Sequence, residues 1–311
     1  MLKPWKQWHR PLITNVTLMI GLALVAGVGV LVDQRMLLGE SVWIKPMKFG
    51  IAFALYSGTL AWLLTRLERA RRFGWWLGTL FAVSATIEVA GITVQAARGT
   101  FSHFNTDVAD PITAAATQAL TTGVAALFLM QLGIAAVLLV QRAGDRAFRR
   151  AVRAGITLST LGMIVPIYWM VTELDRRTVV DANGRQITMY QGHGIGDPDG
   201  HGMPITHWST TGGDYRVPHF VGLHGIQALL LVAAVLGALA TRVAWLRSEQ
   251  VRTRLVGVAA LGYAGVFATV TWQAGRGQSL IHPDALTVIA LAAVVTCTIA
   301  LAIASVRRTA P

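Results

Sequence analysis

Four histidines lie at positions from which their side chains could bind a cofactor. His103, His219, His224 and His282 lie at the ends of long apolar runs. Neutral imidazole binds heme iron, zinc, copper and non-heme iron, so this set predicts a cofactor or metal site. His219 and His224 are five residues apart, about 140° around a helix, so they do not share one helical face. We therefore expect His224, deeper in its apolar run, to face a cofactor. The alternative for each histidine is an interfacial side chain bonded to a backbone carbonyl.

Glu88 is an acid inside the apolar run 81–97. Ionisable residues are costly within a bilayer and usually face the interior of a helix bundle. Gln95 follows seven residues later, hence on the same helical face. Glu88 is therefore predicted to look along that face toward Arg98 and His103. It would act as a proton carrier or general base, or else bond neighbouring helices together.

A short motif occurs in both halves of the chain. Gln95-Ala-Ala-Arg-Gly99 precedes His103, and Gln273-Ala-Gly-Arg-Gly277 precedes His282. The two copies predict a duplicated four-helix unit whose halves are related by a pseudo-two-fold axis along the membrane normal. Arg98 and Arg276 have two interpretations: they cap the helix ends, or they bind carboxylates or phosphates in a central cleft.

Long apolar helices must position these side chains. The chain is 54% hydrophobic and 14% charged, far below the roughly 25% charged residues of soluble domains. Eight segments reach the length of about 20 residues that a bilayer requires: 12–32, 43–64, 74–97, 112–140, 151–172, 219–241, 255–275 and 284–305. We expect an all-α integral membrane protein with a first half at 1–150 and a second half at 151–311. An outer loop is expected at 173–217.

The distribution of positive charge predicts the orientation. Eighteen of the 27 Lys and Arg residues fall in the termini and in alternate loops, beside only three acids. Cytoplasmic loops are enriched in Lys and Arg, so we expect both termini in the cytoplasm. The net charge of +12 is explained in this way, and nucleic acid is not expected as a partner. The abundance of arginine and alanine indicates a bacterial protein, and we therefore expect it in the bacterial plasma membrane.

The outer loop carries three further histidines, His193, His201 and His207. We interpret them as solvated polar residues, with a loose copper or zinc site as the alternative. Asp181-Ala-Asn-Gly184 predicts a turn, and the alternation over 185–190 predicts a short strand or hairpin.

Several runs resemble a family of bacterial, largely actinobacterial, multi-pass integral membrane proteins of unknown activity. The resemblance is carried by Lys45-Pro-Met-Lys-Phe49, Ser102-His-Phe-Asn105, the run 208–224 and Arg276-Gly-Gln-Ser279. A looser likeness is to heme A synthase, whose eight spans form two four-helix halves with paired histidines. His224 and His282 match the pattern of its second half, whereas Lys48 stands where the first half would offer a histidine.

The leading functional hypothesis is a membrane oxidoreductase or electron carrier that binds a b-type heme near the outer face. His224 and His282 would be the axial ligands, with His103 or His219 as substitutes, and Glu88 would move protons. Arg98, Arg276 or Arg216 would meet the heme propionates, and Gln95 and Gln273 are expected among the cofactor-binding residues. A quinone or another small lipophilic molecule would be a partner, beside membrane lipid.

Two other hypotheses stay open. One is a non-heme enzyme acting on a lipid, with zinc, iron or copper held by three of His103, His219, His224 and His282. Glu88 or Asp284 would be its base. The other is a transporter or receptor whose outer cleft binds an anionic ligand through Lys45, Lys48 and the two motif arginines. The sequence predicts neither the substrate nor the oligomeric state.

Overall fold

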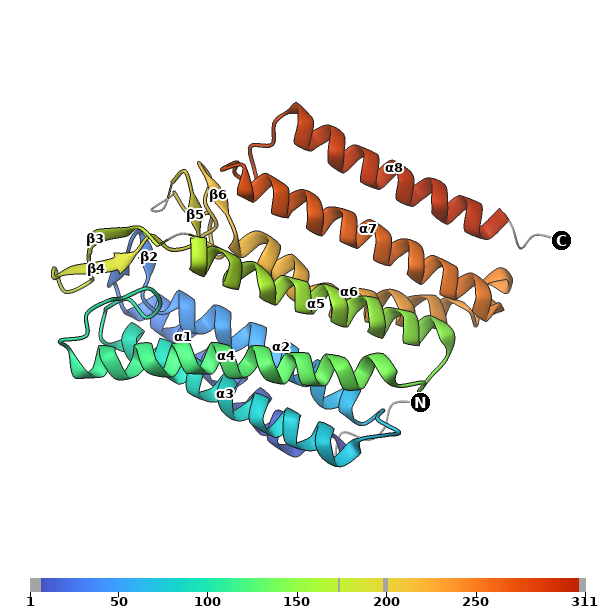
Figure 1. Cartoon of the computed structure of the whole chain (residues 1–311), viewed down its shortest axis with the longest axis horizontal. Helices are drawn as coiled ribbons and strands as arrows, with labels where there is room; N and C mark the ends of the chain where they lie inside the picture. Colours follow the sequence, from blue (N-terminus) through green and yellow to red (C-terminus); the bar gives the residue numbers. More distant parts are fainter. Residues whose placement is uncertain (1–6, 173, 198–200, 308–311) are drawn as a thin grey trace. The chain divides into compact units, whose positions relative to one another are not determined.

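Eight long helices dominate the part of the chain that the structure, a computed structural model, describes: residues 7–172, 174–197 and 201–307. Figure 1 shows them as α1 Arg10–Val32, α2 Ile44–Leu64, α3 Arg71–Ala97, α4 Pro111–Val140, α5 Arg146–Thr172, α6 Arg216–Leu239, α7 Glu249–Gly275 and α8 Ala285–Arg307. Each is long and apolar enough to cross a membrane. The all-α membrane fold predicted from the sequence is confirmed.

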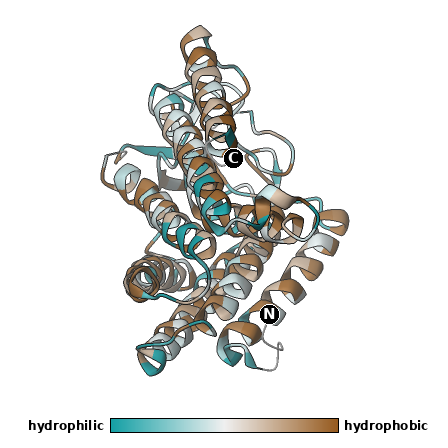
Figure 2. Ribbon diagram, turned by 90° about the vertical axis from the view of Figure 1, so that its right-hand side faces the viewer, coloured by the Kyte–Doolittle hydropathy of each residue, from teal (hydrophilic) through white to brown (hydrophobic). Residues whose placement is uncertain are grey.

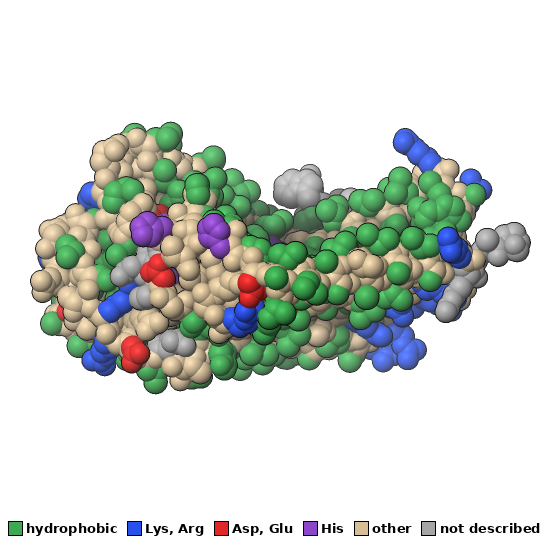
Figure 3. Space-filling model, turned by 90° about the horizontal axis from the view of Figure 1, so that it is seen from above, with side chains coloured by type: hydrophobic (Ala, Val, Ile, Leu, Met, Phe, Trp, Pro, Cys, Tyr) green, Lys and Arg blue, Asp and Glu red, His purple; other side chains and the backbone are tan. Residues whose placement is uncertain are grey.

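The outer surfaces of these helices are apolar, which suits contact with lipid tails. Large hydrophobic side chains such as Leu24, Leu31 and Leu231 are 69%, 77% and 64% exposed. Hydrophobic residues run along the helices in Figure 2. In Figure 3 Lys and Arg side chains are visible at both ends of the helices, but at one end no Asp or Glu side chain is visible beside them. Lys3, Lys6 and Arg308, which the sequence counts on that side, lie outside the described residues.

The chain divides into two compact units. Unit 1 comprises Met1–Ile134, Met170–Gly192 and His201–Trp208, and unit 2 comprises Ala135–Trp169, His193–Gly200 and Ser209–Pro311. Unit 1 therefore holds α1 to α3, most of α4 and the last residues of α5, and unit 2 holds the end of α4, most of α5 and α6 to α8. The long loop between α5 and α6 contributes segments to both units.

Polar side chains join the first three helices within unit 1. Asn15 of α1 is 1% exposed and donates to the Ala82 carbonyl at 3.3 Å and to the Thr86 hydroxyl at 2.9 Å. Its own side-chain oxygen accepts a bond of 2.8 Å from Ser57 of α2. Interhelical bonds of this kind hold helices together where lipid offers no alternative partner.

Close backbone approach joins α5 and α6 within unit 2. A Cβ built at Gly222 would lie 2.5 Å from the Gly162 Cα, so neither position has room for a side chain. Leu158, Leu229 and Val256 pack into a buried cluster below this crossing. Pro166 lies inside the continuous helix α5.

Three short antiparallel pairs lie at the ends of the helices. They are β1 Met36–Leu37 with β2 Glu40–Ser41, β3 Arg176–Val180 with β4 Gln186–Tyr190, and β5 Gly194–Ile195 with β6 Gly213–Asp214. The β3–β4 hairpin confirms the predicted strand at 185–190. Val179, Ile187 and Met189 on one hairpin face pack against the segment that follows α3.

Candidate functional site

A buried acid–base pair occupies the interior of unit 1. The side chain of Glu88, on α3, is 2% exposed, and its Oε1 lies 3.4 Å from Nε2 of His103. His103 belongs to the segment that follows α3, and its side chain is 23% exposed. The chain therefore folds back after α3 so that a partly accessible imidazole reaches an inaccessible carboxyl group.

Glu88 is placed by a continuous buried stripe of α3. Phe81, Ala85, Glu88, Ile92 and Gln95 are all buried and follow one another at spacings of three and four residues. This arrangement confirms that Glu88 and Gln95 share a helical face. Because the stripe is otherwise apolar around Glu88, the carboxyl group has lost most of its solvation.

The second oxygen of this carboxyl group faces α4. A Cβ built at Gly123 would lie 2.6 Å from Glu88 Oε2, so a side chain there would displace the carboxylate from its present position. Among the described residues, Oε2 has no hydrogen-bond partner. A buried acceptor without a partner is unusual and marks a position where a proton, a water molecule or a substrate group would bind.

The start of α2 completes the surroundings of the pair. Lys45 is near enough to attract the Glu88 carboxylate electrostatically, and the Phe49 ring lies 6.0 Å from the His103 ring. Lys48 forms an ion pair with Glu40 and donates a 3.2 Å bond to the Thr206 carbonyl. Of the two lysines predicted to bind an anion, Lys48 is thus already occupied, whereas Lys45 acts on Glu88.

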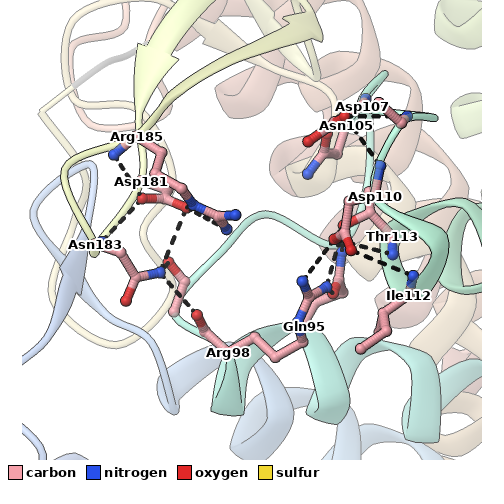
Figure 4. A network of polar contacts seen from close by, with 12 residues as sticks. Gln95, Arg98, Asn105, Asp107, Asp110, Ile112, Thr113, Asp181, Asn183 and Arg185 are labelled. Carbon is pink, nitrogen blue, oxygen red and sulfur yellow. Dashed lines mark hydrogen bonds and ion pairs between the residues drawn. The ribbon is translucent and has the colours of Figure 1, made fainter.

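Arg98 connects the end of α3 to the start of α4, as Figure 4 shows. Its Nη2 lies 2.6 Å from Asp110 Oδ2, and its Nη1 donates to Gln95 Oε1 at 2.8 Å. Asp110 also accepts a 2.6 Å bond from the Thr113 hydroxyl. The bonds from Thr113 and Arg98 lower the pKa of Asp110 to about 2. The β3–β4 turn joins this network, because Asn183 donates to the Arg98 carbonyl at 2.9 Å.

Unit 2 repeats this connection between α7 and α8. Arg276 pairs with Asp284, and Thr287 donates its backbone N–H to the same carboxylate at 2.9 Å. The hydrogen bond from Arg276 is the main reason that the pKa of Asp284 lies well below its usual range. Gln273 donates to the Ser279 carbonyl six residues on, as Gln95 does to Phe101.

The glycine of the repeated motif has the same backbone in both units. Gly99 has φ +70° and Gly277 has φ +71°, a conformation that glycine adopts without the penalty of a side chain. Together with the ion pairs, this turn closes each third helix onto the next. Of the two interpretations of Arg98 and Arg276, the arrangement favours the structural one, since both guanidiniums already bind a carboxylate of their own chain.

Sequence reasoning missed the carboxylates that pair with these arginines. Asp110 and Asp284 each precede a threonine by three residues at the start of a span, and this repeated spacing was a usable signal. A second repeat was also missed: Asp33 binds Arg35 as Asp214 binds Arg216, each with Nη2 to Oδ2 at 2.7 Å.

Arg216, predicted to meet a cofactor, is therefore also paired. Burial raises the pKa of Asp214, but its interactions, chiefly those with His193 and Arg216, together lower this pKa by more than burial raises it. The pKa of Asp214 therefore lies below its usual value. His193 Nδ1 lies 3.5 Å from Asp214 Oδ1, and its ring meets Trp169 edge-on at 6.2 Å. This loop histidine belongs to a packed region of unit 2 and is not simply solvated. His201 and His207 belong to the segment His201–Trp208 of unit 1.

The remaining predicted ligands are dispersed within unit 2. His219 Nδ1 is bonded to the Gly162 carbonyl at 2.8 Å. The His224 ring packs on Phe220 with centroids 4.4 Å apart, and His282 is exposed before α8. Among the described residues, no three His, Cys, Asp or Glu side chains are grouped so that they could hold a metal ion.

Comparison with protein-family models, with curated proteins and with solved structures finds no significant match to this chain.

Proposed function

We propose that this protein is a proton-coupled membrane protein in which Glu88 and His103 carry the proton. The observation that supports this most directly is the buried carboxyl group of Glu88, with one oxygen beside a partly exposed imidazole and the other without a partner. Intramembrane carboxyl and imidazole groups are the usual members of proton relays.

The transfer needs only these two groups. A proton from the aqueous phase first binds His103, the more accessible member of the pair. It then passes from His103 Nε2 to Glu88 Oε1, which leaves a neutral imidazole and a neutral carboxylic acid. The neutral acid is the form that an apolar stripe favours, while Lys45 favours the carboxylate. Two opposing influences of this kind allow the group to change its protonation state.

The proton would be coupled either to electron transfer or to the movement of a solute. The b-type heme hypothesis is a case of coupling to electron transfer, and one observation still supports it. His219 has its Nδ1 bonded to a carbonyl, which leaves Nε2 as the nitrogen that could bind iron. The expected propionate partners Arg98, Arg216 and Arg276 are each paired with an aspartate, so the rest of the predicted heme site does not fit. A Soret band in purified protein from heme-replete cells would support the heme, and its absence in folded protein would exclude it.

The proton-carrying role can be tested without knowing the coupled partner. Infrared difference spectra of membrane-reconstituted protein report a protonated carboxyl group through its carbonyl stretch. A pH titration gives the size of the band, and a rapid pH jump gives the rate at which the band forms and decays. We expect a band from a carboxyl group in apolar surroundings that is lost in Glu88→Gln. In His103→Ala the band should remain but form and decay at least 10-fold more slowly, because the proton has lost its entry group.

The exposed loop residue Glu68 supplies the matched control. Glu68→Gln removes a carboxyl group from the same unit and should leave the band unchanged. A band that survives in Glu88→Gln, or kinetics that are identical with and without His103, would overturn the proposal.

A further inference from the structure

A cavity of about 720 Å³ lies at the opposite end of unit 1 from the Glu88–His103 pair. It is formed where α1 begins, α2 ends and α3 begins. Its walls include Trp8, Arg10, Arg71, Arg72, Trp75 and Trp76. Neither the proton-carrying pair nor the repeated Gln–Arg motif involves these residues.

The cavity is positively charged. Arg10, Arg71 and Arg72 line it, and no acidic side chain does so among the described residues. Within the described part of the chain, these three guanidiniums make no hydrogen bond or ion pair, in contrast to Arg35, Arg98, Arg216 and Arg276. Both α1 and α3 also begin here, so their dipoles add to the attraction for an anion.

Tryptophans give the same cavity an apolar side. Trp75 and Trp76 are 43% and 52% exposed, and their rings meet edge-on at 4.9 Å. Tryptophan is enriched at the level of lipid headgroups, where its ring bridges water and hydrocarbon. Guanidinium groups beside such rings match a ligand with a charged phosphate and an apolar body.

His9 fixes the geometry of the cavity. It is buried between α1 and α3, where Nδ1 accepts a 3.3 Å bond from the Leu12 N–H and Nε2 donates to the Trp75 carbonyl at 2.8 Å. Burial lowers the pKa of His9, which favours the neutral ring that this pair of bonds requires. Trp8 and Arg10 flank His9 in the chain, so this bridge holds them beside the tryptophans and arginines of α3.

We propose that this cavity binds the phosphate headgroup of an anionic phospholipid. The shared chemistry is a phosphate held by Arg10, Arg71 and Arg72, and a free phosphate ion would offer the same charge. The lipid is favoured because the cavity opens among tryptophans at the start of an apolar helix, where acyl chains are present. Basic pockets between helices on the cytoplasmic side are a known form of anionic lipid site.

Native mass spectrometry of detergent-solubilised protein tests the proposal with defined lipids. We expect one phosphatidylglycerol to bind in preference to phosphatidylcholine. The triple variant Arg10→Gln/Arg71→Gln/Arg72→Gln should lose at least 10-fold in affinity for phosphatidylglycerol, since each arginine near anionic lipid contributes substantially. Trp75→Phe/Trp76→Phe should weaken binding less.

A charge-matched control uses three exposed arginines elsewhere. Arg142→Gln/Arg153→Gln/Arg242→Gln removes the same charge without touching the cavity and should retain full binding. Equal loss in both triple variants would mean non-specific attraction and would overturn the proposal. Binding of inorganic phosphate with no preference for the lipid would identify a free-anion site and would overturn it as well.

Discussion

At the scale of single residues, the contact between Glu88 and Gly123 is a tight point of unit 1. A Cβ on α4 at that point would lie 2.6 Å from Glu88 Oε2, so the carboxyl group would have to shift. Unit 2 has no such acid: counting seven residues back from Gln273, as from Gln95 to Glu88, reaches Val266. The duplicated helices therefore share their connections, while the acid–base pair belongs to the first copy alone.

Gly123→Ala should destabilise the protein by about 1 to 3 kcal/mol, because the new methyl group overlaps the Glu88 carboxylate. Thermal unfolding in detergent, followed by circular dichroism at a fixed heating rate, measures the change. The double variant Glu88→Ala/Gly123→Ala should recover most of the lost stability, since the overlapping group is gone.

Gly21→Ala on α1 is the control, because a Cβ there meets nothing within 4 Å. It should leave the unfolding temperature unchanged or slightly higher, as expected for alanine in a helix. Strictly additive effects of the Glu88 and Gly123 substitutions would contradict the proposed contact.

At the scale of helices, the Arg–Asp connections order the turns between α3 and α4 and between α7 and α8. Each combines a helix-ending glycine, an arginine from the last turn and an aspartate that precedes the next helix. Aspartate before a helix also accepts hydrogen bonds from the free N–H groups of the first turn. One carboxylate therefore caps the new helix and holds the arginine of the previous one.

The stability that the Asp110 carboxylate contributes should depend on pH. Its pKa is lowered to about 2, so its contribution is complete above the ordinary aspartate range and is lost as the pH falls toward 2. Asp110→Asn should lower the unfolding temperature at neutral pH, and the difference from wild type should shrink between about pH 4 and pH 2.

Asp175→Asn is the control variant, because Asp175 is exposed and accepts a hydrogen bond from the Gln191 N–H through its backbone carbonyl. It should unfold like the wild type at every pH. A difference between Asp110→Asn and wild type that persisted unchanged at pH 2 would show that the carboxylate charge plays no part.

At the scale of the whole molecule, the eight candidate spans found among the described residues predict that both termini lie on one side of the membrane. The positive-inside bias predicts that this side is the cytoplasm. The predicted orientation puts the Glu88–His103 pair near the outer face and the arginine-lined cavity near the inner face.

Cysteine labelling measures this orientation, since Cys297 is the single cysteine and can be replaced by serine. In intact cells a membrane-impermeant maleimide should label Asp175→Cys. It should label Glu68→Cys and Arg242→Cys only after the membrane is permeabilised. The reverse pattern would place the arginine-rich ends outside and contradict the predicted topology.

Local sequence alone determined the spans, the β3–β4 hairpin and the shared face of Glu88 and Gln95. The physical reason is that a bilayer demands long apolar helices with internally bonded backbones, which composition and periodicity reveal directly. Only the tertiary structure decided that Arg98 binds Asp110, that His103 returns to Glu88, and that Gly123 leaves it room. The repeated spacing of Asp110 and Thr113, and of Asp284 and Thr287, marks those carboxylates in the sequence but not their arginine partners. The contacts of Glu88 with His103 and Gly123 depend on the path of the connecting segments and on the close approach of helices, which no local pattern encodes.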